Sequence, residues 1–261
     1  MEAVKLESDA LSVVVLPELG GKISSLVSRA TGREWLWRNP HLPYRAAAPG
    51  DSYVALHDTG GIDECFPTVA PSLGFPDHGE LWGQAWAVEE RSAERLTLSA
   101  RGKGYRLDRS LRLARLGLEL DYRLQSLSDR NFSFVWCLHP LFAIEPGMTI
   151  EIGGTVVTRI PAEARTATKT FVESPTRGGV ALRTADGREQ VTLAFDRAEV
   201  PFVGLWQNYR GWSGAGTEPY FNLGLEPSIG DCDSLEEAVT RGTAGVLEAG
   251  ARRVWRISLS I

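Results

Sequence analysis

Two side chains in this sequence of 261 residues, Glu226 and His139, have the chemistry and local pattern expected of an acid–base pair. Glu226 follows a run in which every second residue is apolar, so a strand there would place it on one face with Tyr220, Asn222 and Gly224. A carboxylate beside an amide, a phenol and an open glycine position suits a ligand with many hydroxyl groups. The residues alone leave a second interpretation open, in which Glu226 belongs to an ordinary solvent-facing strand.

His139 ends a run of alternating residues in which Phe134, Trp136 and Leu138 share one face. It projects from the other face, directly before Pro140, where regular strand pairing is expected to end. A histidine at a strand end is well placed to line a cleft and to exchange protons near neutral pH. The alternative is a structural histidine bonded to a backbone group, and the local sequence does not decide between the two.

A third candidate, His78, lies in an irregular segment that also contains Gly79, Gly83, Trp82 and Trp86. The glycines make the backbone permissive, and the indole rings offer flat apolar faces. Sugars present C–H-rich faces that pack on such rings, together with hydroxyl groups that need polar partners. Core packing is nevertheless the commoner role of any one tryptophan.

Alternation of apolar and polar residues runs through most of the chain and indicates antiparallel strands with one buried face. We predict closely spaced strands over roughly residues 85–91, 95–101, 105–113, 117–126 and 132–138. The short gaps between them predict a meander of hairpins rather than alternating strands and helices. The predicted fold class is therefore all-β, a large antiparallel β-sandwich with at most one or two short helices, formed by residues 1–261 as one domain.

Three segments depart from the strand pattern, and one of them is the glycine-containing stretch of residues 210–219. Residues 233–242 predict a short helix, with Ser234 and Glu237 as a capping box and Gly242 as its stop. Residues 39–83 are rich in proline, glycine and aromatic side chains. We interpret residues 39–83 as a packed region that wraps one end of the sandwich.

Composition narrows the possible partners. The formal net charge of −5 and the scattered arginines predict no binding of nucleic acid. No run approaches the roughly 20 apolar residues of a membrane helix, and the N-terminal residues lack the apolar core of a signal peptide, so we expect a cytoplasmic protein.

The three cysteines form no CxxC pair, and no two histidines have short ligand spacing, so we predict no metal site. The sequence predicts no oligomeric state.

Four short motifs along the chain resemble, in type and order, those of a known superfamily. They are residues 16–26 (LPELGGKISSL), His78-Gly79 followed by Trp86, residues 136–142 (WCLHPLF), and residues 225–227 (LEP). Together they resemble the galactose mutarotase-like (aldose 1-epimerase) superfamily, and the chain is identified as a divergent member. The resemblance spans most of the chain and implies a large β-sandwich with a pocket on its concave face.

The resemblance also implies a mechanism that interconverts the anomers of a free sugar. Glu226 would be the general base for the anomeric hydroxyl, and His139 the general acid for the ring oxygen on the opposite side of the hemiacetal. His78 would hydrogen-bond the sugar while the ring opens, the C1 end rotates and the ring closes again. No cofactor is needed for this reaction.

Two departures from the superfamily pattern bear on the substrate. Where the relatives carry an Asn-Arg pair, this chain has residues 60–67 without an arginine, and Asp63 and Glu64 are predicted to bond hydroxyl groups instead. No basic residue follows His78-Gly79 closely, which disfavours a phosphorylated hexose. The predicted substrate-binding residues are Asp63, Glu64, Trp82, Gln207 and Asn222.

Two other functions stay open at this point. The same fold could bind or sense a sugar without turning it over. It could also carry another isomerase or lyase that acts on an acidic or modified sugar, for which Lys22, Arg159 or Arg210 would supply a cation in the pocket.

Overall fold

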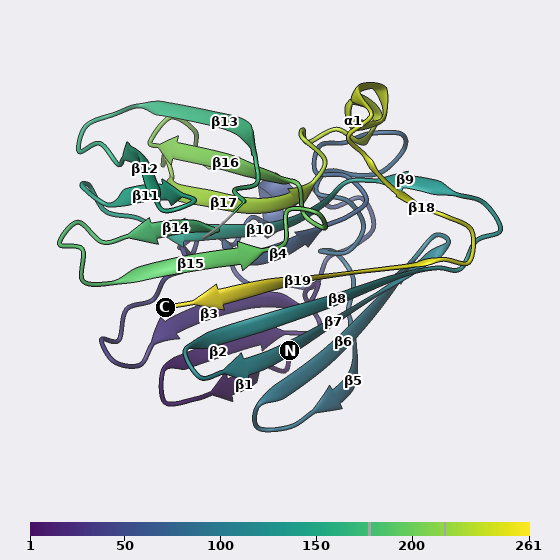
Figure 1. Ribbon diagram of the computed structural model, residues 1–261, viewed down its shortest axis with the longest axis horizontal. Coiled ribbons are helices and arrows are strands. Elements are labelled where there is room, and N and C mark those ends of the chain that lie inside the picture. Colours follow the sequence, from purple (N-terminus) through teal and green to yellow (C-terminus); the bar gives the residue numbers. More distant parts are fainter. Residues whose placement is uncertain (177–178, 217) are drawn as a thin grey trace.

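Antiparallel β-structure accounts for nearly all regular elements of the computed structural model, which describes residues 1–176, 179–216 and 218–261. Within these ranges the strands form an eight-stranded sheet, a nine-stranded sheet and a two-stranded ribbon. Figure 1 shows the two large sheets and, above one end of them, a short helix. The predicted all-β sandwich with few helices is therefore confirmed.

The eight-stranded sheet has the order β1-β2-β3-β4-β10-β17-β16-β13. Its strands are β1 (Val4–Glu7), β2 (Leu11–Leu16), β3 (Lys22–Ser28), β4 (Gly61–Cys65), β10 (Trp136–Ala143), β17 (Phe221–Ile229), β16 (Phe202–Tyr209) and β13 (Thr166–Glu173). Two strands from the middle of the order, β10 and β17, carry the two acid–base candidates.

The nine-stranded sheet has the order β12-β11-β14-β15-β19-β8-β7-β6-β5. Its strands are β12 (Thr155–Arg159), β11 (Thr149–Ile152), β14 (Val180–Arg183), β15 (Gln190–Phe195), β19 (Arg252–Ser260), β8 (Gly117–Ser126), β7 (Tyr105–Ala114), β6 (Arg95–Gly102) and β5 (Ala87–Arg91). The ribbon pairs β18 (Gly245–Leu247) with β9 (Phe132–Phe134).

The predicted meander forms over its first four strands, because β5, β6, β7 and β8 pair in sequence order. The fifth predicted strand, residues 132–138, is instead divided between β9 of the ribbon and the start of β10 in the eight-stranded sheet. Along β8, Leu118, Leu120, Tyr122 and Leu124 are buried in the core shared by the two sheets. The polar residues between them lie on the outer face of the nine-stranded sheet. This division of faces is the pattern that alternation predicts for packed antiparallel sheets.

The predicted helix is α1 (Leu235–Arg241), and the Ser234 side chain accepts a hydrogen bond from the backbone N–H of Glu237. The helix ends at Gly242, whose φ of 73° is the left-handed conformation that glycine adopts easily. One further turn, a π-helix over Tyr53–His57, lies in the long irregular segment. Within the described ranges no helix is long and apolar enough to cross a membrane.

The irregular segment 39–83 contains a strand that the sequence pattern did not reveal. Strand β4 lies between β3 and β10, and all five of its residues are buried. A strand with both faces covered shows no alternation, and this one also carries two carboxylates, Asp63 and Glu64. Several side chains of the same segment, among them Tyr53 and His78, lie with residues of β10 and β17 on one face of the eight-stranded sheet.

A buried ion pair joins the two sheets at β4. Arg109 of β7 and Glu64 of β4 are both fully buried, and Arg109 Nη1 donates to Glu64 Oε1 over 2.9 Å. Tyr122 Oη and Trp136 Nε1 donate to the same carboxylate over 2.6 and 2.9 Å. Arg109 also donates to the carbonyl of Gly21. Glu64 thus receives donors from both sheets.

We expect Arg109→Met to lower the free energy of unfolding by about 3–5 kcal/mol, because it leaves the buried Glu64 carboxylate without its counter-ion. Urea denaturation would measure this loss. Arg112→Met is the matched control on the same strand, since its ion pair with Glu119 is solvent-exposed and contributes about 0–1 kcal/mol. Equal losses in the two variants would contradict the importance given to the buried pair.

Candidate functional site

A cavity of about 200 Å³ lies on the face of the eight-stranded sheet that is turned away from the shared core. Strands β10, β17, β16 and β13 form its floor. The segment 39–83 covers it with Tyr53, Asp58, Asp77 and His78. Three of the candidates proposed from sequence for chemistry, Glu226, His139 and His78, line this one cavity together with Asn222.

Glu226 is fully buried at the floor of the cavity. Its Oε2 lies 2.7 Å from Lys169 Nζ, and its Oε1 lies 3.5 Å from His139 Nε2. A Cβ atom at Gly224 would lie 2.4 Å from Glu226 Oε1, and one at Gly204 would lie 3.2 Å from Oε2. The two glycines therefore make room for the carboxylate itself, whereas the sequence had suggested that Gly224 makes room for a ligand.

His139 lies within β10 and not at a strand end as predicted, because pairing with β4 continues through Pro140 and Leu141. It sits beside Asp63 in that register, and its side chain is buried. Burial lowers the pKa of His139 well below its usual value of 6.5, and the nearby His78 and Lys169 lower it further. His139 is consequently neutral at neutral pH. Its Nδ1 has no hydrogen-bond partner among the described residues.

His78 has a φ of 61°, a left-handed conformation that residues other than glycine rarely adopt. The following Gly79 also has positive φ, and a Cβ there would overlap the carbonyl oxygen of Phe66 at 2.1 Å. Strained backbone of this kind tends to collect at functional sites. The imidazole of His78 stacks on Tyr53 with ring centroids 3.8 Å apart and lies 5.1 Å from the His139 ring.

Asp77 lies beside His78, with 3.1 Å between Asp77 Oδ1 and His78 Nδ1. Burial opposes the charged form of Asp77, but the hydrogen bond and charge of His78 outweigh it and lower the pKa of Asp77. Asp77 is therefore ionised over a wide pH range. The cavity thus contains one histidine beside a carboxylate and one that burial keeps neutral.

Polar and aromatic groups complete the lining. The Asn222 side chain is fully buried, and neither its oxygen nor its nitrogen has a partner within the described part of the chain. A buried amide without partners costs free energy unless a ligand or water satisfies it. Trp206, Trp212 and Tyr220 supply ring faces to the same cavity, and Asn39 donates to Tyr220 Oη over 2.9 Å.

Asp58 is a further buried carboxylate that faces this cavity, and its Oδ1 lacks a partner among the residues described. Burial raises the pKa of Asp58 to about 6, against the opposing effects of His78 and Lys22. At neutral pH this group carries a charge that the fold stabilises poorly. Such a group is available to bond a ligand hydroxyl.

Two residues predicted to bind substrate lie behind the cavity wall. Asp63 accepts hydrogen bonds from Lys22 Nζ and from Tyr53 Oη, the latter over 2.7 Å. The second bond fixes the hydroxyl end of the Tyr53 side chain. Trp82 packs edge-on against Tyr53 and donates its ring N–H to the carbonyl of Asp77. Neither side chain lines the cavity, and both contact Tyr53, which does.

The predictions for Glu64 and Gln207 as ligand contacts are corrected by their position. Glu64 points into the core between the sheets, where Arg109, Tyr122 and Trp136 occupy its oxygens. Gln207 alternates with Trp206 on β16, so it leaves the sheet on the opposite face and donates to Tyr209 Oη. Neighbours along a strand point to opposite faces, and the sequence alone did not show which face is the cavity.

Sequence reasoning missed Lys169, Asp77 and Asp58. Lys169 lies on β13, the edge strand of its sheet, and reaches Glu226 only because β13 pairs with β16. The alternating segment around Lys169 does predict a strand, but nothing in it identifies a neighbour 57 positions away in sequence.

The cations considered for a pocket role lie elsewhere. Lys22 bonds Asp63 and the carbonyl of Gly60, Arg159 donates to the carbonyl of Gly147, and Arg210 lies over the ring of Phe221. Within the described residues no group of three or more His, Cys, Asp or Glu side chains is arranged to hold a metal ion.

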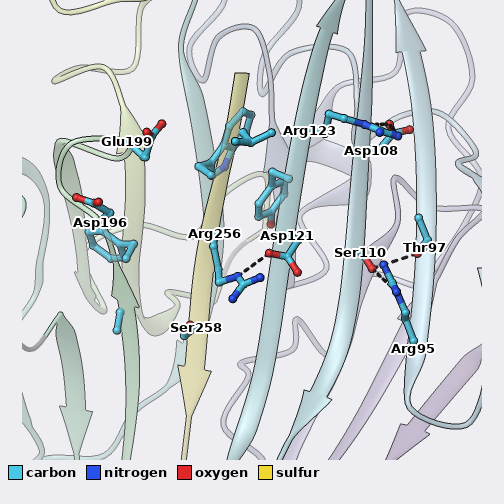
Figure 2. Close-up of a pocket in the computed structure, with 15 residues that line it drawn as sticks. Arg95, Thr97, Asp108, Ser110, Asp121, Arg123, Asp196, Glu199, Arg256 and Ser258 are labelled. Carbon is cyan, nitrogen blue, oxygen red and sulfur yellow. Dashed lines mark hydrogen bonds and ion pairs between the residues drawn. The ribbon is translucent and has the colours of Figure 1, made fainter. Parts of the chain in front are cut away.

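A larger hollow of about 820 Å³ lies on the outer face of the nine-stranded sheet. Figure 2 shows that its charged side chains face one another across the strands, with Arg256 bonded to Asp121 and Arg123 bonded to Asp108. Its charges are thus largely satisfied within the protein. The cavity around Glu226, which holds several buried polar atoms without partners, is the better candidate for a functional site.

Comparison with known proteins places the fold. A family model described as a domain of unknown function (DUF5107) matches residues 1–76, and no curated protein matches the chain. A galactose mutarotase related enzyme from Lactobacillus acidophilus is 17% identical, with 99% of this chain and 97% of that chain covered and a TM-score of 0.71.

Two other solved structures give the same result. A galactose mutarotase-like protein from Lactobacillus casei ATCC 334 is 16% identical, with 99% of each chain covered and a TM-score of 0.70. The Slr1438 protein from Synechocystis sp. PCC 6803 is 18% identical, with 99% of this chain and 95% of that chain covered and a TM-score of 0.72. The chain therefore has the galactose mutarotase-like fold, at low sequence identity.

We expect Asp58→Asn to stabilise the protein at pH 7.5. The pKa of Asp58 is about 6 in the folded protein and about 3.9 in an unfolded chain, so ionisation disfavours folding by roughly 3 kcal/mol once the pH exceeds the folded value. Below about pH 4 the group is protonated in both states and this difference disappears. Thermal unfolding at pH 7.5 and pH 4 would measure both effects.

The exposed Asp9→Asn variant is the control for this experiment, and we expect its unfolding temperature to match the wild type at both pH values. An Asp58→Asn protein that is less stable than the wild type at pH 7.5 would mean that the carboxylate has a stabilising partner, contrary to its position in the cavity.

Proposed function

We propose that the protein is a mutarotase of the aldose 1-epimerase type, which interconverts the anomers of a free monosaccharide by acid–base catalysis. The observation that carries this proposal is the contact between a buried carboxylate and a buried imidazole. Glu226 Oε1 and His139 Nε2 lie 3.5 Å apart in a cavity whose Asn222 amide has no partner among the described residues. The likeness in fold to a galactose mutarotase related enzyme supports the same function.

The spacing of the two groups suits the bonds that must change. The anomeric hydroxyl and the ring oxygen of a cyclic sugar are attached to the same carbon, so a base and an acid that serve them must be close together. Glu226 would take the proton of the anomeric hydroxyl while His139 gives one to the ring oxygen. The two groups lie 3.5 Å apart in the cavity, whereas the resemblance implied an acid and a base on opposite sides of the hemiacetal.

His78 and the aromatic rings would hold the sugar during ring opening. His78 is fixed by its stacking on Tyr53 and by Asp77, and it lies edge-on to His139. Asn222 and Asp58 are the hydroxyl partners, and Trp206 offers a ring face to the C–H groups. His78 and Asp58 project into the cavity from segment 39–83, Asn222 projects from β17, and Trp206 from β16.

The charges of the cavity favour a neutral substrate. Four carboxylates line it, Asp58, Asp77, Glu226 and Asp233, against the single lysine Lys169. A phosphorylated or acidic sugar would meet net negative charge in a poorly solvated space. The volume of about 200 Å³ lies below the range of drug-sized sites, which suits a single sugar ring.

We expect the protein to accelerate anomer exchange of neutral aldoses, and Glu226→Gln to lose roughly 10²–10⁴-fold in kcat because the base is removed. Polarimetry or NMR exchange on a panel of sugars, corrected for spontaneous exchange, would measure the rates. The exposed Glu236→Gln variant on α1 is the control. An undiminished rate in Glu226→Gln would remove Glu226 from the mechanism, and faster turnover of a sugar phosphate would reject the neutral substrate class.

We expect kcat/KM to be highest below pH 6.5 and to fall as the pH rises. The acid form of His139 is required, and burial lowers the pKa of His139 well below 6.5, so the imidazolium fraction falls about tenfold per pH unit above that pKa. A pH series corrected for the spontaneous rate would test this. A constant kcat/KM from about pH 6 to about pH 9 would show that His139 donates no proton as an imidazolium.

The neutral state of His139 also favours one alternative, a sugar-binding protein without turnover. In that case the Asn222 amide, Asp58 and the aromatic rings would still bind a sugar. Tight binding of one monosaccharide in calorimetry, with no acceleration of anomer exchange at any pH from about 4 to about 8, would favour this function over catalysis.

A further inference from the structure

We propose that Lys169 is a positioning residue for the base. Its ammonium group occupies one oxygen of Glu226 and leaves the other oxygen for the substrate. This inference rests on the proposed mutarotase function and adds a residue to its machinery. Nothing in the local sequence around Lys169 points to the role, because the contact depends on the pairing of three strands.

The sheet is built so that the lysine can reach across a strand. Lys169 on β13 is two strands away from Glu226 on β17, a separation of roughly 9–10 Å at the usual strand spacing. The strand between them, β16, has Gly204 directly beside Glu226 in the register. A Cβ atom at Gly204 would lie 3.3 Å from Lys169 Cε and 3.2 Å from Glu226 Oε2. The absence of a side chain there opens the path between the two charged groups.

The ammonium group lies between two carboxylates. Lys169 Nζ is 2.7 Å from Glu226 Oε2 and 2.6 Å from Asp233 Oδ1, the latter in the segment that leads into α1. Burial by itself would lower the pKa of Lys169, but Glu226 and Asp233 outweigh it and raise the pKa above its usual value. The lysine is therefore protonated throughout the working pH range, which makes it a counter-ion rather than a nucleophile or a Schiff-base former.

The two oxygens of Glu226 have different surroundings. Oε2 is held by Lys169 and lies 3.6 Å from Cys137 Sγ. Oε1 faces His139 Nε2 at 3.5 Å and has no hydrogen-bond partner among the described residues. A carboxylate fixed at one oxygen loses its rotational freedom, so the free oxygen is oriented before substrate arrives.

The charge felt by the Glu226 carboxylate depends on the titratable groups that the neighbouring elements place near it. Strand β10 contributes His139 and Cys137, the neighbouring β4 contributes the buried Cys65, and His78 lies beyond His139. Burial raises the pKa of both thiols well above the usual value, so they are neutral, and His139 is neutral near pH 7. Lys169 is consequently the cation in contact with Glu226, with Asp233 as its second carboxylate.

This arrangement matters because His139 carries its proton only in acidic solution. A base that works with this acid must remain a carboxylate at the same low pH. A neighbouring ammonium group favours the charged form of a carboxylate. Lys169 places such an ammonium group against the carboxylate that would work with this acid.

The test is the pH dependence of kcat/KM in Lys169→Met, with Lys169→Arg as the matched variant that keeps the charge. We expect the acidic limb of the Lys169→Met profile to move to higher pH by roughly 1–3 units, because the carboxylate loses its cation. KM should change little, since the ammonium group is occupied by protein carboxylates. Lys169→Arg should retain an acidic limb close to that of the wild type.

Asp233→Asn provides an independent arm if Lys169→Met fails to fold. It removes the competing carboxylate while the carbonyl of Asp233 can still bond Val69 and Ala70. We expect its acidic limb to move to lower pH, opposite to Lys169→Met. Profiles for both variants that superimpose on the wild type after scaling would overturn the role of Lys169, because a purely structural residue changes the amount of active protein and not the shape of the curve.

The two proposals fail in different ways. A wild-type protein without mutarotase activity on any neutral aldose would reject the proposed function before Lys169 is tested. If the wild type is active but its acidic limb stays at the same pH in Lys169→Met and Asp233→Asn, only the positioning role is rejected. A kcat/KM in Lys169→Arg that falls as far as in Lys169→Met, with the same displaced limb, would also reject it, since charge is what the inference requires.

Discussion

The ion pair between Arg109 and Glu64 is the constraint on which the rest of the structure depends. It lies between the sheets, where removing two charges from water is costly. The pair is stable there because Tyr122 and Trp136 donate hydrogen bonds to the Glu64 carboxylate in addition to Arg109. These donors fix β4 and β10 against the nine-stranded sheet. The opposite face of the same two strands carries His139, so the position of the acid candidate follows from a contact on the other side of its own sheet.

The cavity, in contrast, holds charge that the fold satisfies incompletely. Asp58 and Asn222 have buried polar atoms without partners among the described residues, and the backbone at His78 is strained. Each feature costs stability, and none of them supports the core. Proteins tolerate such costs where a ligand will use the groups. The contrast with the fully satisfied Glu64 separates the structural carboxylate of β4 from the carboxylates of the site.

Alternation predicted the fold class, the meander from β5 to β8, and the faces of Glu226 and His139, because each depends on the two-residue period of a strand. It could not predict that these two side chains meet, since β10 and β17 are far apart in sequence and only their pairing joins them. The resemblance supplied that link. Strand β4 was missed because both of its faces are buried, and for the same reason its neighbouring carboxylates were assigned to one role although they point to opposite faces.

Glycines explain why the site is formed at this point of the sheet. A side chain at Gly224 would displace the free oxygen of Glu226, and one at Gly204 would block the approach of Lys169. In a strand without such neighbours, residues that favour strands would be expected at these two positions, because glycine weakens a strand interior. Their presence side by side with a buried carboxylate implies that the space serves the carboxylate. Glu226, Lys169 and the two glycines beside them therefore form one unit. The unit is built across three strands and depends on their register.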